Sequence, residues 1–334
     1  MNVGMWGKAL RGIPRLDKEE WNGLDVISRW LIATRAAVLI MTLLSAAIAG
    51  ILAIKAGQFN ALYWGVMAIG LILAHATNNL LNDLTDFRRG VDKDNYFRAQ
   101  YGPQPLEHGL LTTRQLLTYA GITGGLALLS GIYLVIERGP LAMLLLAAGA
   151  FFVLFYTWPL KYVGLGEIAV LIVWGPLMVG GGYYVTSGMW DWNVVIAGLP
   201  YALGVTTVIF GKHIDKYIED RVKGIHTLPV IIGEKAARIV VTGMVALQYL
   251  LVIYLVAIRF FSPVMLVVLL SLSGIPSFWS MYKNQKPESR PEYYPAEAWP
   301  LYYVAMAFQQ NRRFGLFYLL GLILEVALHA LRVI

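Results

Sequence analysis

Long apolar runs separated by short polar connections dominate the pattern of the chain. A helix needs about 20 apolar residues to cross the hydrocarbon core of a bilayer. Nine runs come close to that length, and they cover residues 36–54, 61–81, 116–136, 140–157, 166–186, 193–210, 236–258, 260–281 and 314–333. The pattern predicts an all-α polytopic membrane protein, with about nine transmembrane helices bundled in a single domain of residues 1–334.

Polar segments precede and join these runs. Residues 1–24 carry charge near both ends and lack the apolar centre of a signal peptide. Trp6, close to Lys8 and Arg11, indicates an anchor at the membrane surface. Residues 283–312 are rich in Pro, Glu and Tyr, and we expect an extended loop there.

The composition supports the membrane prediction. Of the 334 residues, 58% are hydrophobic and 14% are charged, whereas a soluble domain usually carries about 25% charged residues. So few polar residues could not cover the surface of soluble domains, and a disordered chain is excluded for the same reason. Because there is no Cys, disulfide scaffolds, thiolate nucleophiles and Cys-type zinc sites are excluded as well.

Lys and Arg are distributed unevenly between the two sides of the predicted bundle. Of the 27, 23 lie in the N-terminal segment and in the connections after the even-numbered runs, and 4 lie on the opposite side. Loops rich in Lys and Arg stay in the cytoplasm. We therefore predict a cytoplasmic N-terminus, cytoplasmic long loops and a C-terminus outside. The net charge of +7 reflects these loops rather than binding to nucleic acid.

The second apolar run leads directly into an acidic segment. If the helix continues, Asn79, Asp83 and Asp86 lie at i, i+4 and i+7 on one face, with Asn82 at its margin. Neighbouring carboxylates repel each other, and desolvation near a membrane adds to the cost, so a positive charge should lie among them. Such oxygen ligands suit magnesium, above all with phosphate. The alternative is a solvated helix end neutralised by the two arginines that follow.

A second charged segment follows the sixth run. Asp215 and Glu219 share one helical face, while Lys216 and Asp220 lie on another. The acids could hold a metal and the bases could hold phosphate oxygens. The alternative is a loop whose charges pair with one another. Two such clusters at the same predicted side of the membrane favour a metal–diphosphate site.

These motifs resemble those of the UbiA superfamily of intramembrane prenyltransferases, and especially the branch that prenylates 1,4-dihydroxy-2-naphthoate in menaquinone synthesis. That branch carries Asn-Asp-x-x-Asp, then a basic turn containing glycine and a further Asp, as residues 82–92 do. Further similar segments are Gly102-Pro103, residues 109–112, residues 162–167 and Asp220-Arg221-x-x-Gly224 with Thr227-Leu228. The resemblance covers roughly residues 25–260.

The resemblance implies a magnesium-dependent enzyme in a bacterial or archaeal cell membrane. It would transfer an isoprenyl group from a prenyl diphosphate to an aromatic acceptor of the quinone-precursor type. The implied catalytic acids are Asp83, Asp86 and Asp220. The implied magnesium ligands are Asp83, Asp86, Asp92, Asp215, Glu219 and Asp220. The implied substrate contacts are Asn79, Asn82, Arg35, Lys161, Tyr156 and Arg221.

Several of these assignments have simpler alternatives. Arg35 could extend to the headgroups, and Tyr156 could belong to the interfacial aromatic belt. Trp174 and Tyr183 could line the acceptor pocket or pack in the core or against lipid.

The chain also departs from the family pattern. Lys216 stands where the family usually has Asp, so either Asp215 and Glu219 replace that acid or the second motif is more basic. Gln104 and Val163 stand where arginine is common. These differences leave open a terpene cyclase or a transferase with a non-aromatic acceptor. A secondary transporter is a third alternative, disfavoured because the charges cluster at the ends of the runs rather than at the midplane.

Overall fold

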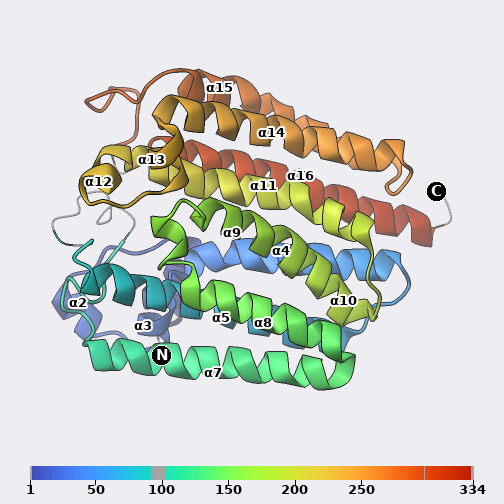
Figure 1. The fold of residues 1–334 in the computed structure, drawn as a ribbon, viewed down its shortest axis with the longest axis horizontal. Helices are drawn as coiled ribbons and strands as arrows, with labels where there is room; N and C mark the ends of the chain where they lie inside the picture. Colours follow the sequence, from blue (N-terminus) through green and yellow to red (C-terminus); the bar gives the residue numbers. More distant parts are fainter. Residues whose placement is uncertain (1, 92, 94–101, 297, 332–334) are drawn as a thin grey trace.

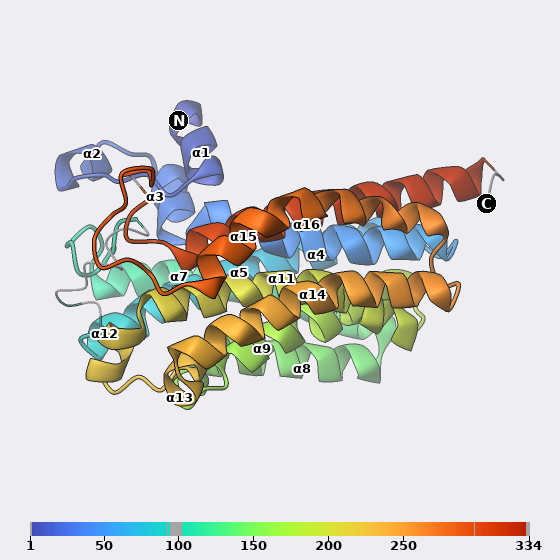
Figure 2. The ribbon, with the colours of Figure 1, turned by 90° about the horizontal axis from the view of Figure 1, so that it is seen from above.

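The computed structural model describes residues 2–91, 93, 102–296 and 298–331, and it is a bundle of helices that lie along one common axis (Figures 1 and 2). Eight helical stretches in the described part of the chain are long and apolar enough to cross a membrane. They are α4 (Ala36–Lys55), α5 (Ala61–Arg88), α7 (Thr113–Arg138), α9 with η2 and α10 (Gly166–Ser187), α11 (Trp192–Asp215), α14 (Glu234–Ala257), η3 with α15 (Pro263–Lys283) and α16 (Tyr303–Ala330). The chain is thus a polytopic, all-helical integral membrane protein.

The predicted count of nine spans is not confirmed. The fourth predicted run forms α8 (Pro140–Phe155), an apolar helix of 16 residues. At 1.5 Å per residue it is about 24 Å long, shorter than the hydrocarbon core of about 30 Å. Shorter helices lie outside the spans, namely α1 (Val3–Arg11), α2 (Lys18–Asn22), α3 (Val26–Ala33), α12 (Tyr217–Val222), α13 (Leu228–Ile232) and the turn η1 (Leu160–Tyr162).

Two helices extend further than the apolar runs predicted. Helix α5 continues through the first acidic segment to Arg88, because Leu80 and Leu84 continue its buried face. Helix α16 begins at Tyr303 rather than near residue 314, because Tyr303 and Ala307 pack in the interior. Part of the expected loop of residues 283–312 is therefore helical.

Helices α2 and α12 lie at one end of the bundle, and the last turn of α16 lies at the other (Figure 1). The first three helices pack beside the end that holds α12 (Figure 2). Asp25 holds this segment together: it accepts hydrogen bonds from the Ser28 N–H at 2.9 Å and the Trp6 indole at 3.2 Å. The Ser28 N–H, followed by the other donors, holds the pKa of Asp25 well below its usual range. Which end faces the cytoplasm stays a prediction.

Small residues let α5 and α7 approach closely. A Cβ added at Gly70 would lie 3.0 Å from the Ser130 Cβ, and one added at Gly124 would lie 3.1 Å from the Thr77 Cγ2. Such close packing of small residues is typical of helices in membranes. Larger buried side chains of α11, α14, η3 and α16 fill the other half of the bundle, among them Tyr249 and Phe314. The half that contains α5 lines the cavity described next.

Candidate active site

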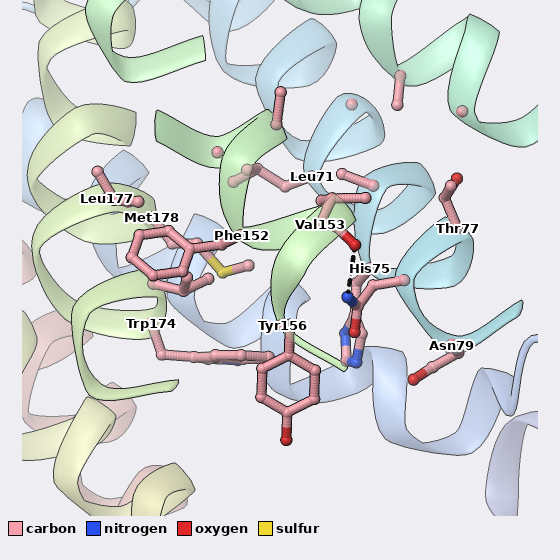
Figure 3. A pocket seen from close by; sticks show the side chains of 18 of the residues that line it. Leu71, His75, Thr77, Asn79, Phe152, Val153, Tyr156, Trp174, Leu177 and Met178 are labelled. Atoms are coloured by element: carbon pink, nitrogen blue, oxygen red, sulfur yellow. Dashed lines mark hydrogen bonds between the residues drawn. The ribbon is translucent and has the colours of Figure 1, made fainter. Parts of the chain in front are cut away.

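A cavity of about 770 Å³ lies between α4, α5, α7, α8, η2 and α11 (Figure 3). Val66 and Asn82 on α5 both line it. These residues are 16 positions apart (82 − 66), so the cavity extends about 24 Å along the helix. Its lining is apolar near Leu134 and Val185 but polar and basic at the end where Lys161 and Lys212 lie. This shape and polarity suit a ligand with a charged head and a long apolar tail.

The carboxylates of the first acidic segment are buried beside the polar end of the cavity. Asp83 and Asp86 are 3% and 7% exposed. Asp83 forms an ion pair with Arg35. Asp86 accepts hydrogen bonds from the Lys161 ammonium at 2.7 and 2.9 Å. The expectation that positive charge lies among these acids is confirmed.

The backbone at Arg35 brings its side chain to Asp83. Arg35 stands between α3 and α4 with φ 56° and ψ 52°, in the left-handed region. Residues with a Cβ seldom adopt this conformation and do so at a cost of about 1 kcal/mol or more. Arg35 pairs with Asp83 and also lines the cavity. These two contacts favour a role in the site over extension of the side chain to the lipid headgroups.

The two amides of the first motif are anchored through their nitrogen atoms. Asn79 Nδ2 donates to the Thr34 carbonyl at 2.8 Å, and Asn82 Nδ2 donates to the Thr157 hydroxyl at 3.1 Å. Both asparagines line the cavity (Figure 3 labels Asn79). Because the NH₂ groups are engaged, the amide oxygens are the groups that can serve as ligands.

The second charged segment adds basic residues to the same region. Helix α11 ends at Asp215, and Lys216, with φ −105° and ψ 16°, separates it from α12. The Lys216 ammonium lies 3.2 Å from the buried Asp220 carboxylate. The charges of both Lys212 and Lys216 act on Asp86.

Several cations gather at this end of the cavity. Arg35, Lys161, Lys212 and Lys216 lie around Asp83, Asp86 and Asp220. The buried Glu167, which bonds His213 at 2.6 Å, adds a further acid near Tyr156. Cations that line a cavity favour an anionic ligand. The two lysines of the second segment fit its more basic interpretation.

Asp215 is engaged elsewhere. Its carboxylate accepts hydrogen bonds from the backbone N–H groups of Tyr302, Tyr303 and Val304 at 3.0–3.1 Å, at the start of α16. Lys286 lies 3.5 Å away. Burial lowers the pKa of Lys286, and the Asp215 carboxylate opposes that shift. This arrangement gives Asp215 a structural role at the start of α16, and its role as a metal ligand stays a prediction.

The remaining predicted residues are less central. Glu219 is half-buried, and its charge acts on Lys286 beside Asp215. Arg221 is exposed on α12 and does not line the cavity. Tyr156 does line it (Figure 3), which favours a ligand contact over an interfacial belt. Asp92 lies outside the described residues.

Of the two aromatic residues considered for an acceptor pocket, one reaches the cavity. Trp174 lines it, whereas Tyr183 is buried in the hydrophobic core. Trp174 belongs to η2 (Val173–Gly181), a π-helical segment that contains Pro176. Proline lacks a backbone donor and disturbs the regular helix, and π-helical turns frequently occur at functional sites.

The oxygen ligands suit magnesium that arrives with phosphate. Among the residues that the structure describes, no three His, Asp or Glu side chains are close enough to hold a metal by themselves. Magnesium is usually bound through one or two carboxylates, with substrate phosphates and water completing the octahedron. Asp83 and Asp86, together with the amide oxygens, fit that mode.

The residue pattern did not single out two cavity residues. Lys212 lies one turn before Lys216 and would have been found by extending the basic face of that segment. His75 lies one turn before Asn79 and continues the stripe of Asn79 and Asp83 into the cavity. The spacing of i, i+4 and i+8 was the available signal.

Curated prenyltransferase-type proteins are similar to the chain in sequence. The chain is 25% identical to a "UbiA prenyltransferase domain-containing protein 1 homolog" of Drosophila melanogaster over 67% of its own length and 63% of that protein, less than two thirds of it. It is 24% identical to a "1,4-dihydroxy-2-naphthoate octaprenyltransferase" of Bacillus subtilis (strain 168), over 76% of this chain and 82% of that one.

Solved structures share the fold. An apo structure of a UbiA homolog from Aeropyrum pernix K1 superposes with a TM-score of 0.63 at 20% identity, covering 85% of this chain and 96% of that one. A UbiA homolog from Archaeoglobus fulgidus, bound to DMAPP and Mg2+, superposes with a TM-score of 0.56 at 14% identity over 86% and 98% of the two chains. The sequence profile of the UbiA prenyltransferase family itself matches residues 43–301, a region that holds both charged motifs and all of the spans except α16 and the start of α4. The chain belongs to the UbiA prenyltransferase family.

Proposed function

We propose that this prenyltransferase moves an isoprenyl group from a prenyl diphosphate, with magnesium, onto an aromatic acceptor such as 1,4-dihydroxy-2-naphthoate. The observation that carries the proposal is the cavity, about 24 Å long in all, whose cation-rich end adjoins Asp83 and Asp86 and whose apolar part lies deeper in the bundle. A diphosphate fits the former and an isoprenyl tail fits the latter. By its Lys and Arg distribution, the charged end would face the cytoplasm.

The basic residues would hold the diphosphate directly. Lys161, Lys212 and Arg35 all line the cavity, and ammonium and guanidinium groups form strong, charge-assisted bonds with phosphate oxygens. Lys161 now bonds Asp86, so it would exchange that carboxylate for phosphate when the donor binds. Asp86 would then be available as a ligand.

Magnesium would be held by Asp83 and Asp86, with the Asn79 and Asn82 oxygens nearby and Asp220 on the opposite side. The Archaeoglobus fulgidus neighbour, bound to DMAPP and Mg2+, supports magnesium as the metal that accompanies the diphosphate. When bound, magnesium neutralises charge on the leaving diphosphate. Asp220 would keep Lys216 oriented toward the same group through their 3.2 Å contact.

The apolar wall would exclude water while the allylic C–O bond breaks, so that the acceptor rather than water attacks. The relative named as a 1,4-dihydroxy-2-naphthoate octaprenyltransferase supports an aromatic acceptor. Trp174 in the cavity wall offers a flat apolar surface for such a ring.

The test is product formation by the purified protein in lipid nanodiscs. Radiolabelled geranylgeranyl diphosphate would be supplied with and without 1,4-dihydroxy-2-naphthoate, in magnesium or in EDTA. The proposal predicts a prenylated naphthoate-derived product only when acceptor and magnesium are both present. Hydrocarbon released without an acceptor would indicate a terpene cyclase instead. Transfer that persists in EDTA would contradict the magnesium assignment.

A further inference from the structure

His75 presents an imidazole to the cavity about 12 Å deeper than Asp83. The two residues are 8 positions apart on α5 (83 − 75), which gives this distance along the helix axis. The Thr42 hydroxyl fixes the ring through Nδ1 at 2.8 Å. His75 lines the cavity and is half-buried, and Nε2 has no hydrogen bond to any residue that the structure describes.

Trp174 packs edge-to-face against this imidazole. The two ring centroids are 5.2 Å apart, and the ring planes are 89° apart. The indole N–H is buried and has no hydrogen-bond partner in the described part of the chain. A buried donor without a partner is uncommon and costs stability, so it needs an explanation. Figure 3 shows His75 and Trp174 together with Tyr156 on the cavity wall.

These two rings lie at the depth where an acceptor is required. If the diphosphate binds beside Asp83 and Asp86, the allylic carbon bonded to it lies next to it, deeper in the cavity. The acceptor must lie against that carbon, deeper than the diphosphate. In that part of the cavity wall, His75 has a ring nitrogen and Trp174 an N–H that have no hydrogen-bond partner among the residues described.

We propose that His75 and Trp174 form the subsite for the acceptor and select an aromatic ring that carries two oxygen substituents. In the tautomer whose Nδ1–H donates to the Thr42 hydroxyl, His75 Nε2 accepts a hydrogen bond from a ring hydroxyl, and the Trp174 N–H donates to the second oxygen. This inference rests on the proposed function, because it concerns the same cavity and its second substrate. A site that hydrogen-bonds substrate hydroxyls discriminates strongly against rings that lack them.

Two substitutions at His75 separate binding of the acceptor from a purely structural role. In His75→Asn, the side-chain amide lies near the position of the imidazole Nδ1 and can keep the hydrogen bond to Thr42. In His75→Gln, the longer side chain places its amide near the position of Nε2. We expect His75→Asn to raise the KM for 1,4-dihydroxy-2-naphthoate about tenfold, the loss of roughly one hydrogen bond. His75→Gln should raise it less. Neither variant should change the affinity for geranylgeranyl diphosphate more than about twofold.

Trp174→Phe provides an independent measurement, because it keeps an aromatic, though smaller, ring and removes the N–H. It should raise the KM for 1,4-dihydroxy-2-naphthoate about fivefold and leave that for 1-naphthol, which has one oxygen, nearly unchanged. Thermal unfolding of each variant in nanodiscs identifies any that fail to fold, and Thr42→Val then tests whether loss of the Nδ1 bond alone reproduces the effect.

The inference is overturned if His75→Asn binds the acceptor like the wild type while His75→Gln does not, because the role of His75 would then be its bond to Thr42. Equal losses of donor and acceptor affinity would overturn it too. A wild type that prenylates no hydroxylated ring would instead refute the acceptor part of the proposed function, before any variant is compared.

Discussion

Buried ion pairs occur at both ends of the bundle, but their surroundings differ. At the end near the last turn of α16, Lys55 pairs with Glu325 at 3.0 Å. Glu325 also accepts from the Ser262 N–H at 3.0 Å and from its hydroxyl, and Lys55 lies over the Phe260 ring. None of these four residues lines the cavity.

At the other end, the pairs of Asp83 and Asp86 adjoin open volume. Lys161 and Arg35 line the cavity, and the charges of Lys212 and Lys216 act on Asp86 as well. A buried ion pair is therefore not evidence of a functional site by itself, since it can simply connect helices. The cavity and the additional lysines beside it distinguish the site from the structural pair.

The largest effect should come from removing the metal-binding charge. Asp83→Asn and Asp86→Asn keep the shape of the side chain but should each lower the rate of prenyl transfer at least about 10³-fold, because the leaving diphosphate loses its stabilisation. Initial rates with geranylgeranyl diphosphate measure this. Glu325→Gln is the control at the opposite end and should keep the wild-type rate per folded molecule. Comparable losses in all three variants would remove the distinction between the two ends.

A smaller effect is expected from one identical substitution made at both ends. Lys161→Met should weaken binding of geranylgeranyl diphosphate about 10- to 100-fold, because a charge-assisted bond to phosphate is lost. Lys55→Met should leave that affinity unchanged and lower the thermal midpoint, because Glu325 loses its partner. Equilibrium binding and thermal unfolding in the same nanodiscs measure both. If Lys161→Met bound the donor normally, the direct contact would be ruled out.

Asp215→Asn should affect stability more than catalysis. The change weakens three hydrogen bonds at the start of α16, and we expect about 1–3 kcal/mol of destabilisation. The magnesium concentration that gives half-maximal rate should stay at its wild-type value. A variant with normal thermal stability that needs far more magnesium would restore the metal-binding role of Asp215.

The smallest effect is expected for Arg221→Ala. Arg221 is exposed on α12, so its charge is screened by solvent. The KM for the prenyl diphosphate should change less than about twofold. A tenfold increase would mean that α12 closes over the site when the donor binds.

Most of the fold followed from the sequence, because a run of about 20 consecutive apolar residues is typical of a helix that spans the membrane. The spacing of Asn79, Asp83 and Asp86 also predicted the shared face, since α5 continues as a regular helix to Arg88. The start of α16 was missed, because Tyr303 and Asn311 interrupt the apolar pattern although both are buried.

The roles of individual charges were harder to predict. A one-residue displacement of an acid cannot reveal that α11 ends at Asp215 and that the carboxylate caps a helix nearly 90 positions later. In the same way, the partner of Arg35 depends on a left-handed residue between two helices, which no apolar pattern records. His75 was overlooked because a single histidine in an apolar run indicates no function until the cavity is known.

The central claim is that the cavity end beside Asp83 and Asp86 binds a diphosphate together with magnesium. Equilibrium binding of radiolabelled geranylgeranyl diphosphate to the protein in nanodiscs, with magnesium or with EDTA, tests it most directly. We predict that magnesium strengthens binding at least about tenfold in the wild type and in Glu325→Gln, but not in Asp86→Asn. Equal affinity with magnesium and with EDTA in the wild type would contradict the claim.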